Sequence, residues 1–142
     1  MKRLIGFMIL ALIPVAILTS LNPEKVFEKP EMTERYLSVR GADTVAFVRD
    51  GCPHCAGFEA YADEHGIDVM YYEVTQIDSQ KLFSELQERA PSLNQGVPTI
   101  VINGSVSQGY DTDEHGEAIE SRLAACQGTT DGCLPFKDFL KS

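Results

Sequence analysis

The sequence is short of positive charge. Lysine and arginine number 12 against 21 aspartate and glutamate residues, which gives a formal net charge of −9. Because Lys2 and Arg3 contribute +2 to this sum, residues 4–142 carry −11. Nucleic acids and anionic membrane surfaces attract clustered positive charge, so this balance argues against both as partners. The chain also has no internal repeat and no low-complexity tract, so composition points to an ordinary globular protein.

The first residues of the chain predict export. Lys2 and Arg3 precede an apolar run over residues 4–18 that ends in polar residues, which is the pattern of an export signal. No A-x-A-like cleavage site follows, and residues 4–21 are just long enough to span a bilayer. Both a cleaved signal peptide and an uncleaved anchor stay open, and we favour the anchor, with its basic end in the cytoplasm. No cysteine lies near the end of the run, which excludes a lipoprotein anchor.

The remainder of the chain is expected to be exported. We interpret residues 1–21 as a signal peptide or N-terminal membrane anchor, and residues 22–38 as a linker with a short helix that opens at Pro30. Residues 39–142 are enough for one compact domain and too few for two. The expected location is the periplasm, with residues 4–21 in the bacterial inner membrane if they are retained.

Four cysteines lie beyond the leader, and the first two form a Cys-Pro-His-Cys motif. An apolar, β-branched run over residues 44–48 precedes the motif, and a helical pattern follows it. This order places Cys52 at a helix N-cap, Pro53 at the first helical position and Cys55 one turn further on. Unpaired N–H groups and the helix dipole then stabilise a thiolate on Cys52. Zinc sites use the same spacing, but a strand before the motif and a helix after it favour redox chemistry.

The expected chemistry is thiol–disulfide exchange. Cys52 is the exposed sulfur that attacks or is attacked, and Cys55 resolves the mixed disulfide. His54, when protonated, and Arg49 add positive charge near the Cys52 thiolate, while Asp50 opposes them. A stabilised thiolate makes the disulfide more oxidising.

The apolar pattern predicts helices and strands in alternation. Asp78 is expected to cap a helix, with Ile77 and Leu82 as its hydrophobic staple, and Asp111 is expected to cap the last helix with Glu114 in a capping box. The expected elements are a helix after residue 30, strands 44–48 and 67–74, helices ending at 66 and 90, a strand after 98 that turns at Asn103-Gly104 into strand 105–108, and a last helix from 111. This order predicts an α/β protein with a mixed sheet and helices on both faces.

Three motifs resemble those of glutaredoxins, which are members of the thioredoxin-fold superfamily. They are Cys52–Cys55, the Val-Pro-Thr-Ile-Val-Ile-Asn-Gly run over Val97–Gly104, and Gly109–Asp111, in the order and spacing of that family. The resemblance spans about residues 44–126 and implies a four-stranded mixed sheet flanked by helices. It also implies a thiol–disulfide oxidoreductase with a cis Val97–Pro98 peptide that faces the sulfurs and pairs with bound thiol substrates.

The resemblance also implies a set of substrate-binding residues. Arg49 matches the position where glutaredoxins carry a lysine near the nucleophile, and the full set is Arg49, Val97, Pro98, Thr99, Gly109 and Asp111. Gln108 and Thr112 depart from the two glycines and two acidic residues of the glutathione-binding turn. The expectation is therefore no cofactor, with glutathione left open as a co-substrate.

His54 stands where glutaredoxins usually carry tyrosine. Cys-Pro-His-Cys is the site sequence of DsbA, the periplasmic disulfide oxidase, but the chain has no room for the helical insertion of that protein. The sequence contains no tryptophan, so it is not a thioredoxin proper. The expected partners are exported proteins with thiols or disulfides, together with a membrane or periplasmic redox protein.

The second cysteine pair is Cys126 and Cys133, which enclose a turn-rich loop. In an oxidising compartment we expect a structural disulfide that fastens the C-terminal segment to the domain, in preference to a second redox pair. Two other functions stay open: a redox-inert adaptor that holds a partner chain, and a zinc module that uses all four cysteines. The two pairs are separated by 70 residues and each is explained without metal, so we predict no metal site.

Overall fold

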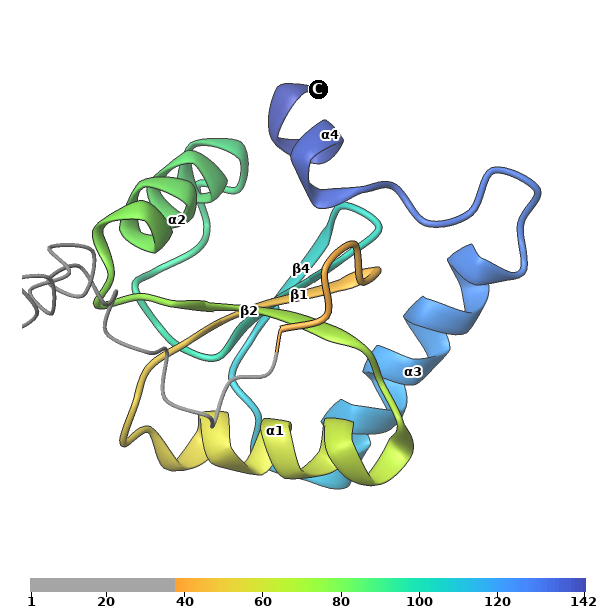
Figure 1. Cartoon of the computed structure of the whole chain (residues 1–142), viewed down its shortest axis with the longest axis horizontal. Coiled ribbons are helices and arrows are strands. Elements are labelled where there is room, and N and C mark those ends of the chain that lie inside the picture. The colour runs from red at the N-terminus through yellow and green to blue at the C-terminus, as the bar shows by residue number, and fades with distance from the viewer. Residues whose placement is uncertain (1–37) are drawn as a thin grey trace, which may run out of the picture. The chain divides into compact units, whose positions relative to one another are not determined.

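The computed structural model describes residues 38–142 (Figure 1). The predicted leader and almost all of the predicted linker and short helix fall on residues 1–37, which lie outside the described residues. No helix within residues 38–142 is long and apolar enough to cross a membrane. The elements are β1 (Thr44–Val48), α1 (Pro53–His65), β2 (Val69–Glu73), α2 (Ile77–Arg89), β3 (Thr99–Ile102), β4 (Ser105–Gln108), α3 (Asp113–Gln127) and α4 (Phe136–Lys141).

The four strands form one mixed sheet in the order β2-β1-β3-β4. β1 is parallel to β2 and antiparallel to β3, and β3 and β4 form a hairpin. Asn103 and Gly104 make the hairpin turn with φ of 50° and 73°, as the Asn-Gly pair predicted. All residues of β1 and β3 are buried, which is why both central strands appear in the sequence as continuous apolar runs. The predicted α/β class and four-stranded mixed sheet are therefore confirmed.

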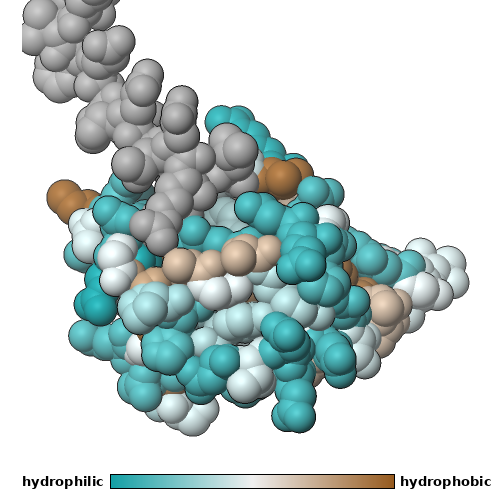
Figure 2. All heavy atoms as spheres, turned by 90° about the horizontal axis from the view of Figure 1, so that it is seen from below, coloured by the Kyte–Doolittle hydropathy of each residue, from teal (hydrophilic) through white to brown (hydrophobic). Residues whose placement is uncertain are grey.

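Helices cover both faces of the sheet, α1 and α3 on one face and α2 and α4 on the other (Figure 1). Side chains alternate along β1 to match: Ala46 and Val48 pack into the cluster with α1 and α3, while Val45 and Phe47 pack into the cluster with α2 and α4. Figure 2 looks onto the α1 side, and hydrophilic residues make up most of its coloured surface. The two apolar clusters hold the sheet rigidly between them, and the site is built at the end of β1.

Several helix ends differ from the prediction. α2 begins at Ile77 after Gln76, so Asp78 lies in its first turn and is not the cap. The Ile77 side chain is 83% exposed, so the predicted staple with Leu82 does not form. α3 is preceded by Thr112 at the N-cap position, because Asp111 pairs with another helix as described below.

The C-terminal helix α4 was not predicted. It is six residues long, too short for an apolar period to be visible in the sequence. Phe136 is its buried anchor and lies beside Phe47 and Tyr72, with ring centroids 5.8 and 6.1 Å apart. The helix therefore depends on this contact with the sheet, because so short a helix is not stable alone.

Candidate active site at the start of α1

The topology brings two distant loops together. β1 and β3 are antiparallel, with Phe47 opposite Thr99, so the loop after β1 and the loop before β3 meet at one end of the sheet. The first loop carries Cys52 and the second carries Val97 and Pro98, joined by a cis peptide bond. The Cys52 Sγ lies 3.7 Å from the Val97 carbonyl oxygen, to which it donates. The predicted cis peptide is confirmed, and it lies against the predicted nucleophile.

Cys52 occupies the N-cap of α1. Its Sγ accepts a hydrogen bond from the Cys55 N–H at 3.2 Å, and its own N–H donates to the Arg49 carbonyl at 3.2 Å. Pro53 follows at the first helical position, where its missing N–H leaves no donor unsatisfied. The Cys52 residue is only 6% exposed, whereas the sequence predicted an exposed sulfur. The difference arises because the Val97 loop and the core side chains cover Cys52 from the sheet side.

Cys55 lies one turn further on and is fully buried. Burial raises the pKa of its thiol to about 12, and the hydrogen bond with Cys52 and the negative charges of Cys52 and Glu59 act in the same direction. Both cysteines of the motif are free thiols in this structure. Cys52 keeps 6% of its surface exposed and Cys55 keeps none, so Cys52 is the more accessible of the two.

The side chains of His54 and Asp111 are in direct contact beside the cysteine motif. The His54 Nδ1 lies 2.8 Å from the Asp111 carboxylate and 2.9 Å from the Tyr110 carbonyl oxygen. Both neighbours are acceptors, so Nδ1 must carry a proton. The side chains are 56% and 62% exposed. Asp111, which the resemblance placed in substrate binding, is thus engaged by the second residue of the α1 helix.

The remaining predicted residues surround the Pro98 loop. The Gly109 N–H donates to the Pro98 carbonyl at 2.8 Å, with Gly109 at a φ of 85°. Thr99 is fully buried, and its hydroxyl donates to the Gly96 carbonyl at 2.7 Å. Arg49 reaches the site through its backbone carbonyl, and its side chain is exposed. The structure therefore gathers all the predicted active-site and substrate-binding residues at one end of the sheet.

One residue at this end was missed. Gln108 reaches from β4 into the loop before Pro98, where its side-chain amide contacts Asn94, Gly96 and Thr99. The only signal in the sequence was that an amide stands where the resemblance expected a glycine. That signal showed a departure from the family and did not show what the amide contacts.

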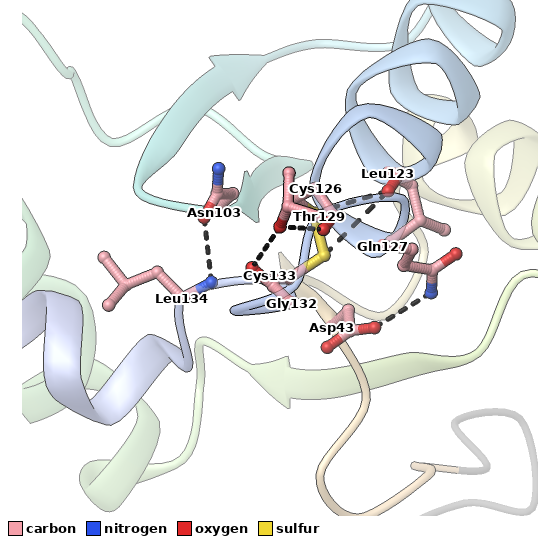
Figure 3. The surroundings of a disulfide bond; sticks show 9 residues. All are labelled: Asp43, Asn103, Leu123, Cys126, Gln127, Thr129, Gly132, Cys133 and Leu134. Atoms are coloured by element: carbon pink, nitrogen blue, oxygen red, sulfur yellow. Dashed lines mark hydrogen bonds between the residues drawn. A yellow bond between two sulfur atoms is a disulfide. The ribbon is translucent and has the colours of Figure 1, made fainter.

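Cys126 and Cys133 form a disulfide bond at the end of α3 (Figure 3). Their Cα atoms are 4.7 Å apart, and Thr129 closes the loop between them through its hydroxyl and the Cys126 carbonyl at 2.7 Å. Just beyond the bond, the Leu134 N–H donates to the Asn103 side-chain oxygen at 2.8 Å, which ties the segment to the β3–β4 turn (Figure 3). Within residues 38–142, no group of three or more His, Cys, Asp and Glu side chains is placed to hold a metal ion.

Known proteins similar to this chain include glutaredoxins. Residues 44–106 match the glutaredoxin family model. The crystal structure of a glutaredoxin from Archaeoglobus fulgidus is similar, with 18% sequence identity and a TM-score of 0.46, and the alignment covers 55% of this chain and 86% of that one. A search among curated proteins gave no match. Residues 44–106 are therefore glutaredoxin-like in sequence, the described residues have an α/β thioredoxin-like fold, and the free cysteine pair supports a thiol–disulfide redox role.

Proposed function

We propose that the protein is an exported thiol–disulfide oxidoreductase that acts on protein thiols or disulfides through Cys52 and Cys55. One observation carries the proposal: Cys52 caps α1, accepts from the Cys55 N–H, and lies beside the Val97 carbonyl. A purely structural thiol would need neither the helix start nor a backbone segment beside it. The apolar N-terminal run and the Cys126–Cys133 disulfide support an oxidising compartment.

The bonds and electrons of the exchange reaction balance between the cysteine pair and the substrate. The Cys52 thiolate attacks one sulfur of a substrate disulfide, a new S–S bond forms, and the other substrate sulfur leaves as a thiolate. Cys55 then loses its proton and attacks the Cys52 sulfur, which closes the Cys52–Cys55 disulfide and releases the second substrate thiolate. The substrate gains two electrons and the pair loses two. In the opposite direction, the disulfide of the pair takes two electrons from a substrate dithiol.

The surroundings of Cys55 set the order of these steps. Burial is the largest cause of the raised Cys55 pKa, and the hydrogen bond with Cys52 and the negative charge of Cys52 add to it. In the mixed disulfide Cys52 carries no charge, so the two contributions of Cys52 fall away while that of burial remains. Cys55 therefore gives up its proton more readily in the mixed disulfide than beside a Cys52 thiolate.

The site favours a polypeptide over glutathione as substrate. Asp111, the acidic residue of the expected glutathione turn, is paired with His54. Gln108 replaces a glycine of that turn and fills the neighbouring space with its side chain. In contrast, the Val97 peptide is half-buried and faces Cys52, and within the described residues its N–H has no hydrogen-bond partner. An extended substrate strand can pair with that peptide through its own backbone.

Trapping of mixed disulfides tests the proposal. Cys55→Ser removes the resolving thiol, so mixed disulfides between Cys52 and exported proteins should accumulate on non-reducing gels. Cys52→Ser removes the nucleophile and is the matched control, which should trap almost nothing. A redox-inert adaptor would give no trapped species with either variant, and equal trapping by both would overturn the assignment of Cys52 as nucleophile. Zinc content measured on the same samples tests the alternative that the four cysteines form a zinc-binding module, because that module would contain bound zinc.

A further inference from the structure

The side chain of Gln108 makes an unusually dense set of contacts with the loop before Pro98. Gln108 is the last residue of β4 and lies opposite Thr99 in the sheet register. Its Nε2 lies 3.0 Å from the Asn94 carbonyl oxygen, 3.1 Å from the Gly96 carbonyl oxygen and 2.9 Å from the Thr99 hydroxyl. Its Oε1 accepts from the Asn94 N–H at 3.3 Å. The Gln108 side chain thus contacts the loop at Asn94 and at Gly96, and it also contacts Thr99 at the start of β3.

The chemistry of these partners fixes the orientation of the amide. The Thr99 hydroxyl already donates to the Gly96 carbonyl, so toward Gln108 it acts as an acceptor. Nε2 therefore faces three acceptors, which share its two hydrogens, and Oε1 faces a donor. Turning the amide over would place an oxygen against three oxygens. No other polar side chain of the same length, such as glutamate, supplies two hydrogens and an acceptor in this arrangement.

The loop is folded tightly around a second amide, that of Asn94. The Asn94 Oδ1 accepts from the Gly96 N–H at 2.6 Å, and a Cβ on Gly96 would lie 2.6 Å from that oxygen. The conformation of Gly96 is thus set by Asn94 on one side and by Gln108 on the other. Gly96 directly precedes Val97, whose carbonyl lies 3.7 Å from the Cys52 sulfur. Any change in the position of Gly96 is passed on to the Val97 peptide.

We propose that Gln108 is a positioning residue for substrate, because it fixes the Gly96–Val97 backbone with which a substrate polypeptide pairs beside Cys52. The inference rests on the proposed function and adds to it the residue that shapes the groove. Gln108 touches neither sulfur, so it acts through the loop. A polypeptide that pairs with the Val97 peptide needs the loop in its place, whereas a small disulfide that meets only the sulfur does not.

Two substrates and one control variant test this role. We would measure, for the reduced full-length protein, the rate of reaction with insulin disulfides and with dithiodipyridine, a small aromatic disulfide. Gln108→Met keeps the length of the side chain and removes all four hydrogen bonds, and Gln108→Asn keeps the amide but withdraws it, as a milder variant. The matched control is Gln87→Met, because the Gln87 Nε2 donates from α2 to the same Asn94 carbonyl at 3.2 Å. Melting temperatures are recorded for every variant.

The expected result is a split between the two substrates. Gln108→Met should lower the second-order rate constant for insulin about tenfold, which corresponds to about 1.4 kcal/mol of transition-state stabilisation. Its rate with dithiodipyridine should stay within about twofold of wild type, and Gln108→Asn should fall between the two. Gln87→Met should change neither rate. Unchanged insulin kinetics in folded Gln108 variants, or an equal loss with both substrates, would overturn the positioning role. A wild-type protein that reacts with neither disulfide would overturn the proposed function itself.

Discussion

Loss of the Cys126–Cys133 disulfide should lower the stability of the domain by an amount that follows from its loop. The bond joins residues seven positions apart, so it closes a loop of about eight residues. The chain-entropy model assigns such a loop about 2.5 kcal/mol at 25 °C. Cys133 is partly exposed, so Cys133→Ser removes the bond with little other change. For a domain of about 100 residues, a loss of that size lowers Tm by roughly 10–20 °C.

Urea unfolding of wild type and Cys133→Ser, with and without reductant, measures this contribution. Without reductant the variant should unfold at the lower urea concentration, and its slope m should be equal to or slightly larger than that of wild type, because its unfolded chain is less constrained. With dithiothreitol the two proteins should unfold together, because wild type then lacks the bond as well. Thiol counting confirms that the wild-type bond is formed in the first experiment. Equal midpoints without reductant, in a protein whose bond is formed, would refute the argument that this loop constrains the unfolded chain.

Two further perturbations have definite expected outcomes. A Cβ on Gly116 would overlap the ring of Tyr61, whose hydroxyl donates to Glu120 one turn further along α3. Gly116→Ala should therefore lower the free energy of unfolding by about 2 kcal/mol, although alanine has the better helix propensity. Gly57→Ala is the matched control, since its Cβ would lie 3.3 Å from the nearest ring, and chemical unfolding of both variants checks the difference. The pKa of Cys55 is raised from 9.0 to about 12, so the folded protein holds this proton more tightly than the unfolded chain. The contribution of this proton to stability is complete below about pH 9 and is lost as pH rises toward 12. Wild type should therefore lose more stability than Cys55→Ala over that range, which urea unfolding at several pH values would show. An equal loss in both proteins would contradict the assignment of the raised pKa to Cys55.

Local patterns were enough to predict most of the fold. The central strands are buried on both faces, and the turns between elements use Asn103-Gly104 and the left-handed Gly66, whose φ is 64°. These signals depend on residues a few positions apart, so they survive in a single sequence. The cap prediction at Asp78 failed because α2 already begins at Ile77, and the one at Asp111 failed because its carboxylate has another partner, which sequence spacing does not show. The Asp111 carboxylate contacts His54, which lies 57 residues earlier in the chain.

The candidate active site was predictable to the extent that it depends on the cysteine motif and on the family resemblance. Cys52, Cys55 and the Val97–Pro98 peptide meet as expected, because β1 and β3 must lie side by side in this topology. The contacts of Gln108 were not predictable, because they depend on the register between β3 and β4 and on the path of an irregular loop. The burial of Cys52 was missed for the same reason.

The positions of the two cysteine pairs along the chain also limit mispairing during folding. Four cysteines can pair in three ways, and only one of these joins sequence neighbours on both sides. A first wrong bond between Cys55 and Cys126 would close a loop about nine times as long as the one between Cys126 and Cys133. In the unfolded chain, loop-closure entropy makes that longer loop about 2 kcal/mol less favourable, or roughly thirtyfold rarer. Oxidation at that stage is thus biased toward bonds within each pair, so Cys52 and Cys55 are not consumed in bonds to Cys126 or Cys133.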